Sequence, residues 1–154
     1  MAQKFKKPPD VRRVKGFFNE MALKYANDVI SGSVLAGKFV RLAAERHLKD
    51  LEKSKDPNYA FNFDIEKGER VCRFIELLPH TKDKWAQNKE LIVLQPWQVF
   101  IVMVLFGWLR RFGSKAGKRR FRTAYIEVPR KNGKSLLAAG IGNYMFLADG
   151  EYGS

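Results

Sequence analysis

The sequence predicts an α/β fold in which several helices precede one strand, a glycine-containing loop and a final helix. Three observations carry this prediction. Apolar residues recur at helical spacing through much of residues 16–90, Phe121–Val128 alternates and is rich in aromatic and β-branched residues, and Gly133-Lys134-Ser135 separates that run from a further apolar segment. With 154 residues, of which 45% are hydrophobic, the chain can bury the core of one ordinary domain.

The N-terminal part divides into a basic, flexible arm at residues 1–15 and a helical region at residues 16–90. In the helical region, Asp64 has the character of an N-cap and Pro79 of a helix stop. The spacing of apolar residues predicts three helices, over residues 17–30, 37–52 and 65–78. A polar connector is expected to follow the third helix.

The most apolar run of the chain is Leu91–Leu109. Gln95, Pro96 and Gln98 interrupt it, which leaves about ten continuous apolar residues, too few to cross a bilayer. We therefore expect a buried helix that begins near Pro96, where proline is tolerated because first-turn amides have no helical partner. Residues 91–94 are expected to form a short strand.

Positive charge is concentrated after this run. The net charge is +13, which favours a polyanionic partner, and seven of the thirteen residues in Arg110–Arg122 are basic. Two glycines predict a flexible loop here. Either this loop contacts the phosphates of a nucleic acid, or it is only a solvated turn between helix and strand. The candidate phosphate contacts are Arg110, Arg111, Lys115, Lys118, Arg119 and Arg120.

Cysteine and histidine give no sign of redox or metal chemistry. Cys72 is the single cysteine, so the chain contains no disulfide and no Cys/His zinc spacing, and a reducing compartment fits best. Its apolar neighbours favour a core residue over a nucleophile. His47 and His80 have no visible metal or acid–base partner and are interpreted as structural or surface residues.

The run Val128–Ser135 has the features of a phosphate-binding loop. Such a loop needs a strand, a glycine that turns backbone amides towards phosphate oxygens, and a helix N-terminus. A lysine then reaches the phosphates and the next Ser or Thr binds Mg²⁺, and Gly133, Lys134 and Ser135 supply these residues in order. Val128 departs from the glycine of the full pattern, so a helix N-terminus without a ligand is the alternative.

Arg130 lies inside this loop, three residues before Gly133. A guanidinium at this place could stabilise the charge that develops on a transferred phosphoryl group, as an arginine finger does. The alternative is that Arg130 and Lys131 only add positive charge.

Two long runs carry a resemblance to a known family: "RFRTAYIEVPRKNGKSLLAAGIGNYMFLADGE" and, upstream, "FIELLPHTKDKWAQNKELIVLQPWQVFIVMVLFGW". They resemble the large terminase subunit of tailed double-stranded DNA phages, which joins an N-terminal P-loop ATPase to a C-terminal nuclease and packages viral DNA into capsids. The resemblance extends from about Tyr25 to the end of the chain. It implies that residues 91–154 are the start of a P-loop ATPase domain.

Position by position, the resemblance implies ATP and Mg²⁺ as cofactors, a deviant Walker A motif that tolerates Val128, and an adenine-recognising glutamine at Gln98, with Gln95 a weaker candidate. An amide side chain suits this role because it both donates and accepts hydrogen bonds. Arg130 and Lys134 are the implied catalytic residues, and Ser135 the residue that binds Mg²⁺. The implied nucleotide-binding residues are Trp97, Gln98, Pro129, Arg130, Lys131, Asn132, Gly133, Lys134 and Ser135.

The expected whole is an incomplete P-loop NTPase, the N-terminal portion of a terminase large subunit without the remaining strands, a Walker B aspartate or the nuclease. Asp149 and Glu151 lie on the wrong element to replace the missing acids, so we expect weak ATP binding and negligible hydrolysis. The resemblance implies the cytoplasm of a bacterial host as location. It also implies double-stranded DNA, the small terminase subunit and the portal ring as partners, with a homo-oligomer or a separately encoded remainder, and no membrane.

A second function, from a different class, is a non-enzymatic basic module for DNA binding or assembly.

Overall fold

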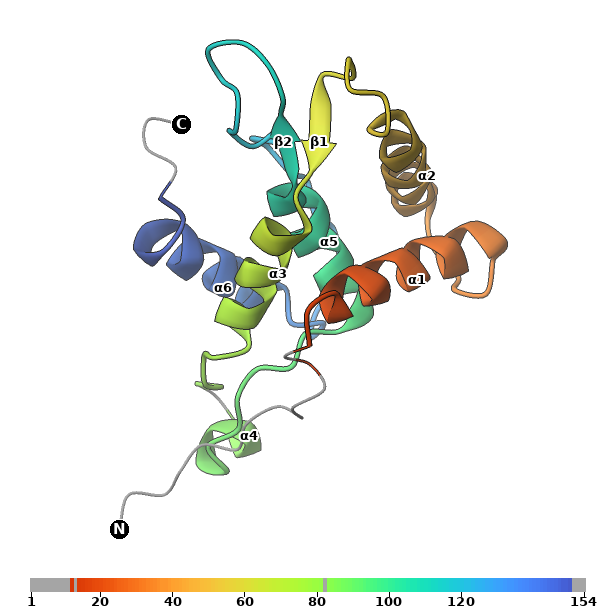
Figure 1. Ribbon diagram of the computed structural model, residues 1–154. Helices are drawn as coiled ribbons and strands as arrows, with labels where there is room; N and C mark the ends of the chain where they lie inside the picture. The colour runs from red at the N-terminus through yellow and green to blue at the C-terminus, as the bar shows by residue number, and fades with distance from the viewer. Residues whose placement is uncertain (1–11, 13, 82, 151–154) are drawn as a thin grey trace.

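The computed structural model describes Arg12, residues 14–81 and residues 83–150, and it combines helices with a small antiparallel sheet (Figure 1). This mixture confirms the coarse α/β prediction. Most of the basic arm predicted at residues 1–15, namely residues 1–11 and 13, lies outside the described residues. Within the described residues, no helix is both long enough and apolar enough to span a membrane.

The first two helices, α1 (Phe17–Ser31) and α2 (Lys38–Lys53), lie where the apolar spacing predicts them. Gly32 ends α1 at φ 85°, a left-handed conformation that glycine adopts without a steric penalty. The buried positions of α1 recur every three or four residues, so that one face of the helix enters the core. These positions are Phe18, Ala22, Ala26 and Val29.

Helix α3 (Ile65–Ile75) begins at the predicted N-cap, where the Asp64 carboxylate accepts a hydrogen bond from the Lys67 N–H at 3.0 Å. It ends three residues earlier than predicted, because the N–H groups of Leu77 and Leu78 bond three rather than four residues back. The connector that follows is not wholly irregular: it contains a short helix, α4 (Asp83–Gln87), that the sequence did not predict.

The central element is α5 (Pro96–Gly107), which begins at Pro96 as predicted and packs against α1 and α3 (Figure 1). Because neighbours cover it on several sides, its buried positions do not follow a single stripe. They are Gln98, Val99, Phe100, Val102, Met103, Val104, Phe106 and Gly107.

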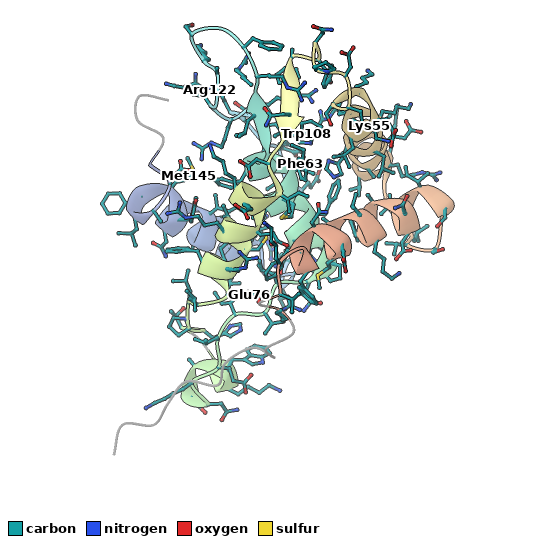
Figure 2. All side chains as sticks on the ribbon, viewed as in Figure 1. Lys55, Phe63, Glu76, Trp108, Arg122 and Met145 are labelled. Carbon is teal, nitrogen blue, oxygen red and sulfur yellow. The ribbon has the colours of Figure 1, made fainter. Side chains whose placement is uncertain are left out.

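A two-stranded antiparallel sheet continues from the end of α5. It pairs β1 (Phe61–Phe63) with β2 (Trp108–Arg110), and the sequence predicted neither strand. Figure 2 shows Phe63 and Trp108 close to one another, with ring centroids 5.1 Å apart. Gly107 permits this packing, since a Cβ there would lie 2.5 Å from Cε2 of Phe63.

Residues 108–120 form a hairpin that begins with β2 and contains most of the basic run Arg110–Arg122. The prediction of a flexible loop over this whole run is therefore wrong. The Arg110 N–H donates to the Lys118 carbonyl at 2.9 Å, and the Arg120 N–H donates to the Trp108 carbonyl at 2.8 Å. Within the hairpin, the exposed residues are those of the turn, residues 112–117.

The strand predicted at Phe121–Val128 is wrong for the described residues: this segment has no ladder partner there, and Tyr125 is 87% exposed. Its alternating pattern suits a strand, but a strand exists only when another backbone satisfies its amides. Residues 91–94 likewise form no strand beyond the isolated bridge of Leu91 with Pro79.

Helix α6 (Lys134–Leu147) follows the loop as predicted. The small residue Gly140 lets α6 approach α3, because a Cβ there would lie 3.0 Å from Cγ2 of Ile75. At its exposed side Phe146 is 87% accessible.

His47, interpreted as structural or surface, and Cys72, interpreted as a core residue, are both buried, whereas His80 is half-buried. His47 is 1% exposed and its Nδ1 accepts a hydrogen bond from Nε1 of Trp108 at 3.0 Å. Burial lowers the pKa of His47 to about 4, so the ring is neutral at physiological pH. Burial also raises the pKa of the Cys72 thiol, which makes it a poor nucleophile.

Candidate functional site

The loop Pro129–Ser135 connects residues 121–128 to α6: its first five residues lie in neither a helix nor a ladder, and its last two begin α6. Lys131 and Gly133 both have positive φ, 67° and 71°. Glycine adopts this region freely, but a lysine in it is uncommon and marks a tightly determined turn. Residues 129–135 are all exposed, so an anion can reach the turn from solvent.

The turn delivers the chain to the N-terminus of a fourteen-residue helix. Gly133 is the N-cap, its carbonyl accepts the Leu137 N–H at 2.9 Å, and Lys134 and Ser135 are the first two residues of α6. The first amides of a helix have no intrahelical partner and carry the positive end of the helix dipole. Neither the N-cap side chain nor an acidic residue of the first turn satisfies these amides.

The predicted adenine residue lies beside this turn. Gln98 belongs to the first turn of α5 and is 4% exposed, and its Nε2 would be 3.1 Å from a Cβ placed on Gly133. Its Oε1 accepts the Gln95 N–H at 2.8 Å. Two residues 35 positions apart in the sequence, Gln98 and Gly133, are therefore in contact.

The other predicted nucleotide contacts have less defined surroundings. Trp97 is half-buried at the start of α5, and Arg130, Lys131, Lys134 and Ser135 are exposed. The Asn132 side chain donates to the Pro129 carbonyl at 3.5 Å, across the base of the turn. The role of Arg130 as a catalytic residue stays a prediction.

The hairpin residues predicted to contact nucleic acid fall into three groups. Three of them bind protein groups: Arg119 pairs with Asp149 and Arg120 with Asp50, each at 2.6 Å, and Arg111 donates to two backbone carbonyls. Lys115 differs, because it lies in the exposed turn. Arg110 and Lys118 are half-buried near the base.

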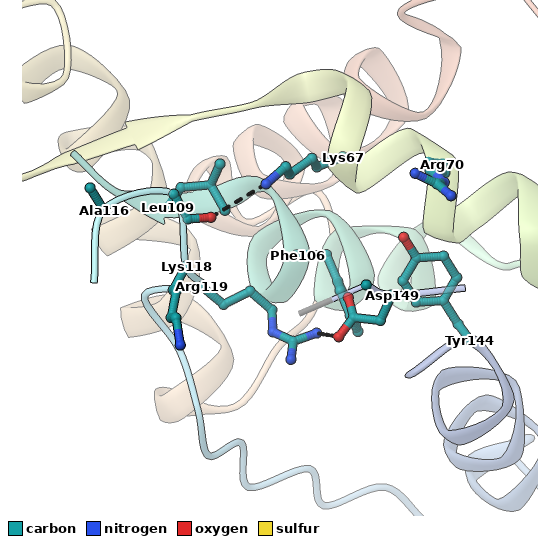
Figure 3. Close-up of a pocket in the computed structure, with 11 residues that line it drawn as sticks. Lys67, Arg70, Phe106, Leu109, Ala116, Lys118, Arg119, Tyr144 and Asp149 are labelled. Carbon is teal, nitrogen blue, oxygen red and sulfur yellow. Dashed lines mark hydrogen bonds and ion pairs between the residues drawn. The ribbon is translucent and has the colours of Figure 1, made fainter. Parts of the chain in front are cut away.

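A pocket of about 420 Å³ lies elsewhere, between α3, the hairpin and the end of α6 (Figure 3). Lys67 and Arg70 line one side, and the ion pair of Arg119 with Asp149 lines the other. None of the predicted nucleotide contacts lines it. Asp149 is held by Arg119 at the far end of α6 from Lys134, so it cannot serve the loop.

The fit to ATP and Mg²⁺ rests on the loop itself. Among the described residues, no group of three or more His, Cys, Asp or Glu side chains could hold a metal ion. A Mg²⁺ ion at the loop would therefore depend on the nucleotide phosphates and the Ser135 hydroxyl, as nucleotide-bound Mg²⁺ commonly does. The uncapped first amides of α6, together with Lys134 and Ser135, fit a nucleotide phosphate with its Mg²⁺.

Sequence reasoning missed one buried carboxylate near Gln98. Glu76 is 4% exposed and accepts the Leu94 N–H at 2.9 Å, one residue before the N-cap of α5. No local signal marks position 76, since its neighbour Leu77 is apolar but 63% exposed.

Comparison with known proteins supports the resemblance of the C-terminal part. The family described as terminase large subunit, ATPase domain, matches residues 96–154, a segment that contains Gln98, the hairpin and the loop. This match confirms the similarity to terminase large subunits that the sequence motifs indicate. No curated protein and no solved structure matches the chain.

Proposed function

We propose that this chain, whose residues 96–154 match the terminase ATPase domain, binds ATP with Mg²⁺ at the loop Pro129–Ser135. In this proposal it is a portion of the large subunit that drives viral DNA into procapsids. The observation that supports the proposal is the contact of Gln98 with Gly133. It brings the amide proposed to recognise adenine next to the turn proposed to bind phosphate.

Each residue has a defined part in binding. The α6 amides and Lys134 would hold the phosphate oxygens, and the Ser135 hydroxyl would be a ligand of Mg²⁺. Gln98 offers its amide to the adenine edge. Arg130, exposed in the turn, would be placed to balance the charge of the terminal phosphoryl group. The nucleotide supplies the phosphoanhydride bond and the metal its Lewis acidity.

Nucleotide titration of the purified chain tests the proposal. Lys134→Ala should weaken ATP binding by at least about tenfold, since a charge-assisted contact to phosphate contributes roughly 1.5–3 kcal/mol. Lys115→Ala, which removes the same charge from the exposed hairpin turn, is the matched control and should leave ATP affinity unchanged. Equal ATP affinity in the unsubstituted chain and Lys134→Ala would refute the loop as the site.

A second candidate function is DNA binding without catalysis, and the exposed position of Lys115 in the hairpin turn favours testing it. Binding of double-stranded DNA should fall steeply with salt, and Lys115→Ala should lower the slope of log K against log salt by about one. Lys134→Ala should not change this slope. If only DNA binding is observed, the basic-module function replaces the ATPase assignment.

The remaining expectations follow from the family and are part of the same proposal. The small terminase subunit and the portal ring are the proposed partners, and the cytoplasm of a bacterial host is the proposed location.

A further inference from the structure

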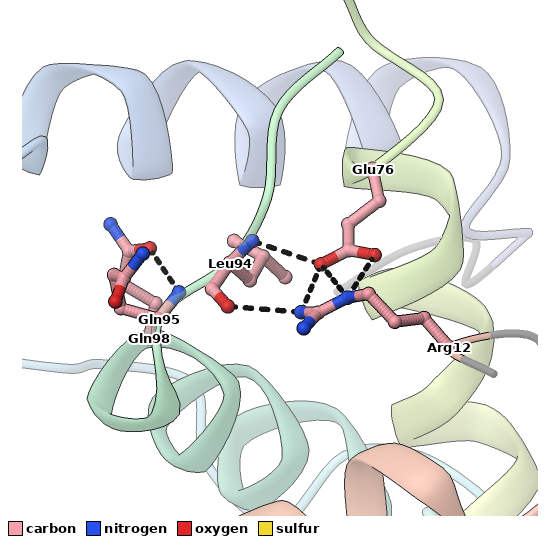
Figure 4. Close-up of polar contacts among 5 residues, drawn as sticks. All are labelled: Arg12, Glu76, Leu94, Gln95 and Gln98. Carbon is pink, nitrogen blue, oxygen red and sulfur yellow. Dashed lines mark hydrogen bonds and ion pairs between the residues drawn. The ribbon is translucent and has the colours of Figure 1, made fainter. Parts of the chain in front are cut away.

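A buried ion pair brackets the peptide that precedes α5. Arg12 donates through Nε to both carboxylate oxygens of Glu76, at 3.1 and 3.0 Å, and through Nη2 to the Leu94 carbonyl at 3.0 Å. The same carboxylate accepts the Leu94 N–H at 2.9 Å. Both polar groups of Leu94 are thus held by one pair of charges (Figure 4).

The bracket is built rather than incidental. The side chains of Arg12 and Glu76 are 12% and 5% exposed, and Leu94 is 1% exposed. The Arg12 guanidinium also lies over the rings of Phe17 and Phe18, at 5.1 and 5.5 Å from their centroids. Buried charges persist only when they are paired and hydrogen-bonded, and these are.

The bracket is one residue away from the amide that orients Gln98. Gln95 follows Leu94, and its N–H donates to Oε1 of Gln98 at 2.8 Å. Because the Gln95 N–H holds Oε1, the Gln98 amide cannot turn over, and its Nε2 is the atom that points towards Gly133. A glutamine free to rotate would present donor and acceptor in either order and could accept guanine as well as adenine.

We infer that Arg12 and Glu76 are positioning residues for base selection: by fixing the Leu94 peptide they hold Gln98 in the orientation that recognises adenine. This inference rests on the proposed ATP binding. Both positioning residues lie outside the matched residues 96–154: Arg12 belongs to the N-terminal segment, and Glu76 follows the last residue of α3.

The test compares ATP and GTP binding by the full chain and by Arg12→Met/Glu76→Gln. This double variant removes both charges at similar volume, a replacement that buried pairs often tolerate, and its thermal unfolding establishes that it folds. The variant should bind ATP about tenfold more weakly, as expected for one lost buried hydrogen bond, with GTP affinity little changed. The ratio of the two affinities is the readout, because general destabilisation would lower both.

Lys15→Ala is the matched control. Lys15 is a nearby basic residue of the same segment, and its pair with Glu66 on α3 is exposed, 76% and 70%. This control should keep the ATP-to-GTP ratio of the unsubstituted chain. Hydrogen exchange supplies a readout that needs no nucleotide: the amides of Leu94 and Gln95 should exchange at least about tenfold faster in the double variant only.

The outcomes separate the two proposals. A folded double variant with an unchanged ATP-to-GTP ratio overturns the positioning role while ATP binding stands. An unsubstituted chain that binds no ATP overturns the proposed function, and the base-selection role with it.

Discussion

Arg120→Ala should destabilise the fold strongly, although Arg120 lies in a basic run that suggests contact with DNA. Its Nη1 donates to Oδ2 of Asp50 at 2.6 Å, and the two side chains are 17% and 7% exposed. The guanidinium also lies 4.2 Å from the ring centroid of Phe61. The side chain therefore joins the base of the hairpin to α2 and to β1.

The magnitude follows from what the substitution leaves behind. Asp50 would remain buried and, among the described residues, would keep the Tyr59 hydroxyl as its side-chain partner, which donates to Oδ1 at 2.7 Å. Breaking a buried ion pair costs about 3–5 kcal/mol, and the remaining hydroxyl favours the lower end, about 3 kcal/mol. For a chain of this size that corresponds to a fall in Tm of roughly 6–12 °C.

Thermal and urea unfolding followed by circular dichroism provide the assay. Lys115→Ala, in the exposed turn of the same hairpin, should change stability by less than about 0.5 kcal/mol. Adding Asp50→Asn to Arg120→Ala should cost less than the sum of the two single changes, because the pair is coupled. Arg120 would be a DNA contact and not a structural residue if Arg120→Ala unfolded like Lys115→Ala and lost affinity for DNA.

Three further outcomes are expected. Burial lowers the pKa of His47 to about 4 from 6.5 in the unfolded chain, so the neutral ring contributes up to about 3 kcal/mol to the free energy of unfolding above pH 6.5, and this contribution is lost as the pH falls towards 4. Urea midpoints measured against pH should show this loss, and His47→Asn should flatten the pH dependence. In urea unfolding, Gly107→Ala should destabilise the protein by about 1–3 kcal/mol, because the added Cβ would meet the ring of Phe63. Gly142→Ala should stabilise α6 by up to about 1 kcal/mol, because a Cβ there meets no described atom within 4 Å. Cys72 should react with a thiol reagent much faster in urea than in the native chain, because burial raises its pKa and blocks access.

Elements with local signals could be predicted from the sequence. The periodicity of α1 and α2, the Asp64 cap of α3 and the proline that begins α5 are each decided within a few neighbouring residues. The helix after Gly133 has the same character, since a glycine that ends the loop is followed by the helix-forming run Leu136–Ala139. For the site, the residues themselves indicated the loop, whereas Gln98 was named from the resemblance to terminase large subunits, and the nucleotide-binding role of both stays a prediction.

Features that depend on distant partners could not be predicted. β1 and β2 are each three residues long and meet only because the fold places Phe61 opposite Arg110. Phe121–Val128 illustrates the reverse case, in which a good strand pattern has no ladder within the described residues. A local pattern shows that a strand is compatible with the residues, whereas hydrogen bonding to another backbone decides whether it forms.

The buried ion pairs escaped prediction for the same reason. Arg12 and Glu76 are 64 positions apart, and Asp50 and Arg120 are 70 apart. In the sequence each of these four residues is one of 45 charged residues, so nothing distinguishes a buried ion-pair partner from a solvated side chain. Counting basic residues in the hairpin therefore overestimates the number available to a nucleic acid.

The position of α5 determines how the two candidate functions can be separated. Its first turn holds Gln98 beside the loop, and its last residue leads directly into β2 and the basic hairpin. Twelve helical residues span about 18 Å, roughly twice the Debye length at physiological salt. Removing a charge at Lys115 therefore leaves the electrostatic potential at Lys134 nearly unchanged, and the converse also holds. Each lysine is thus a valid control for the other, so a loss of ATP binding or of DNA binding can be assigned to one end of the helix.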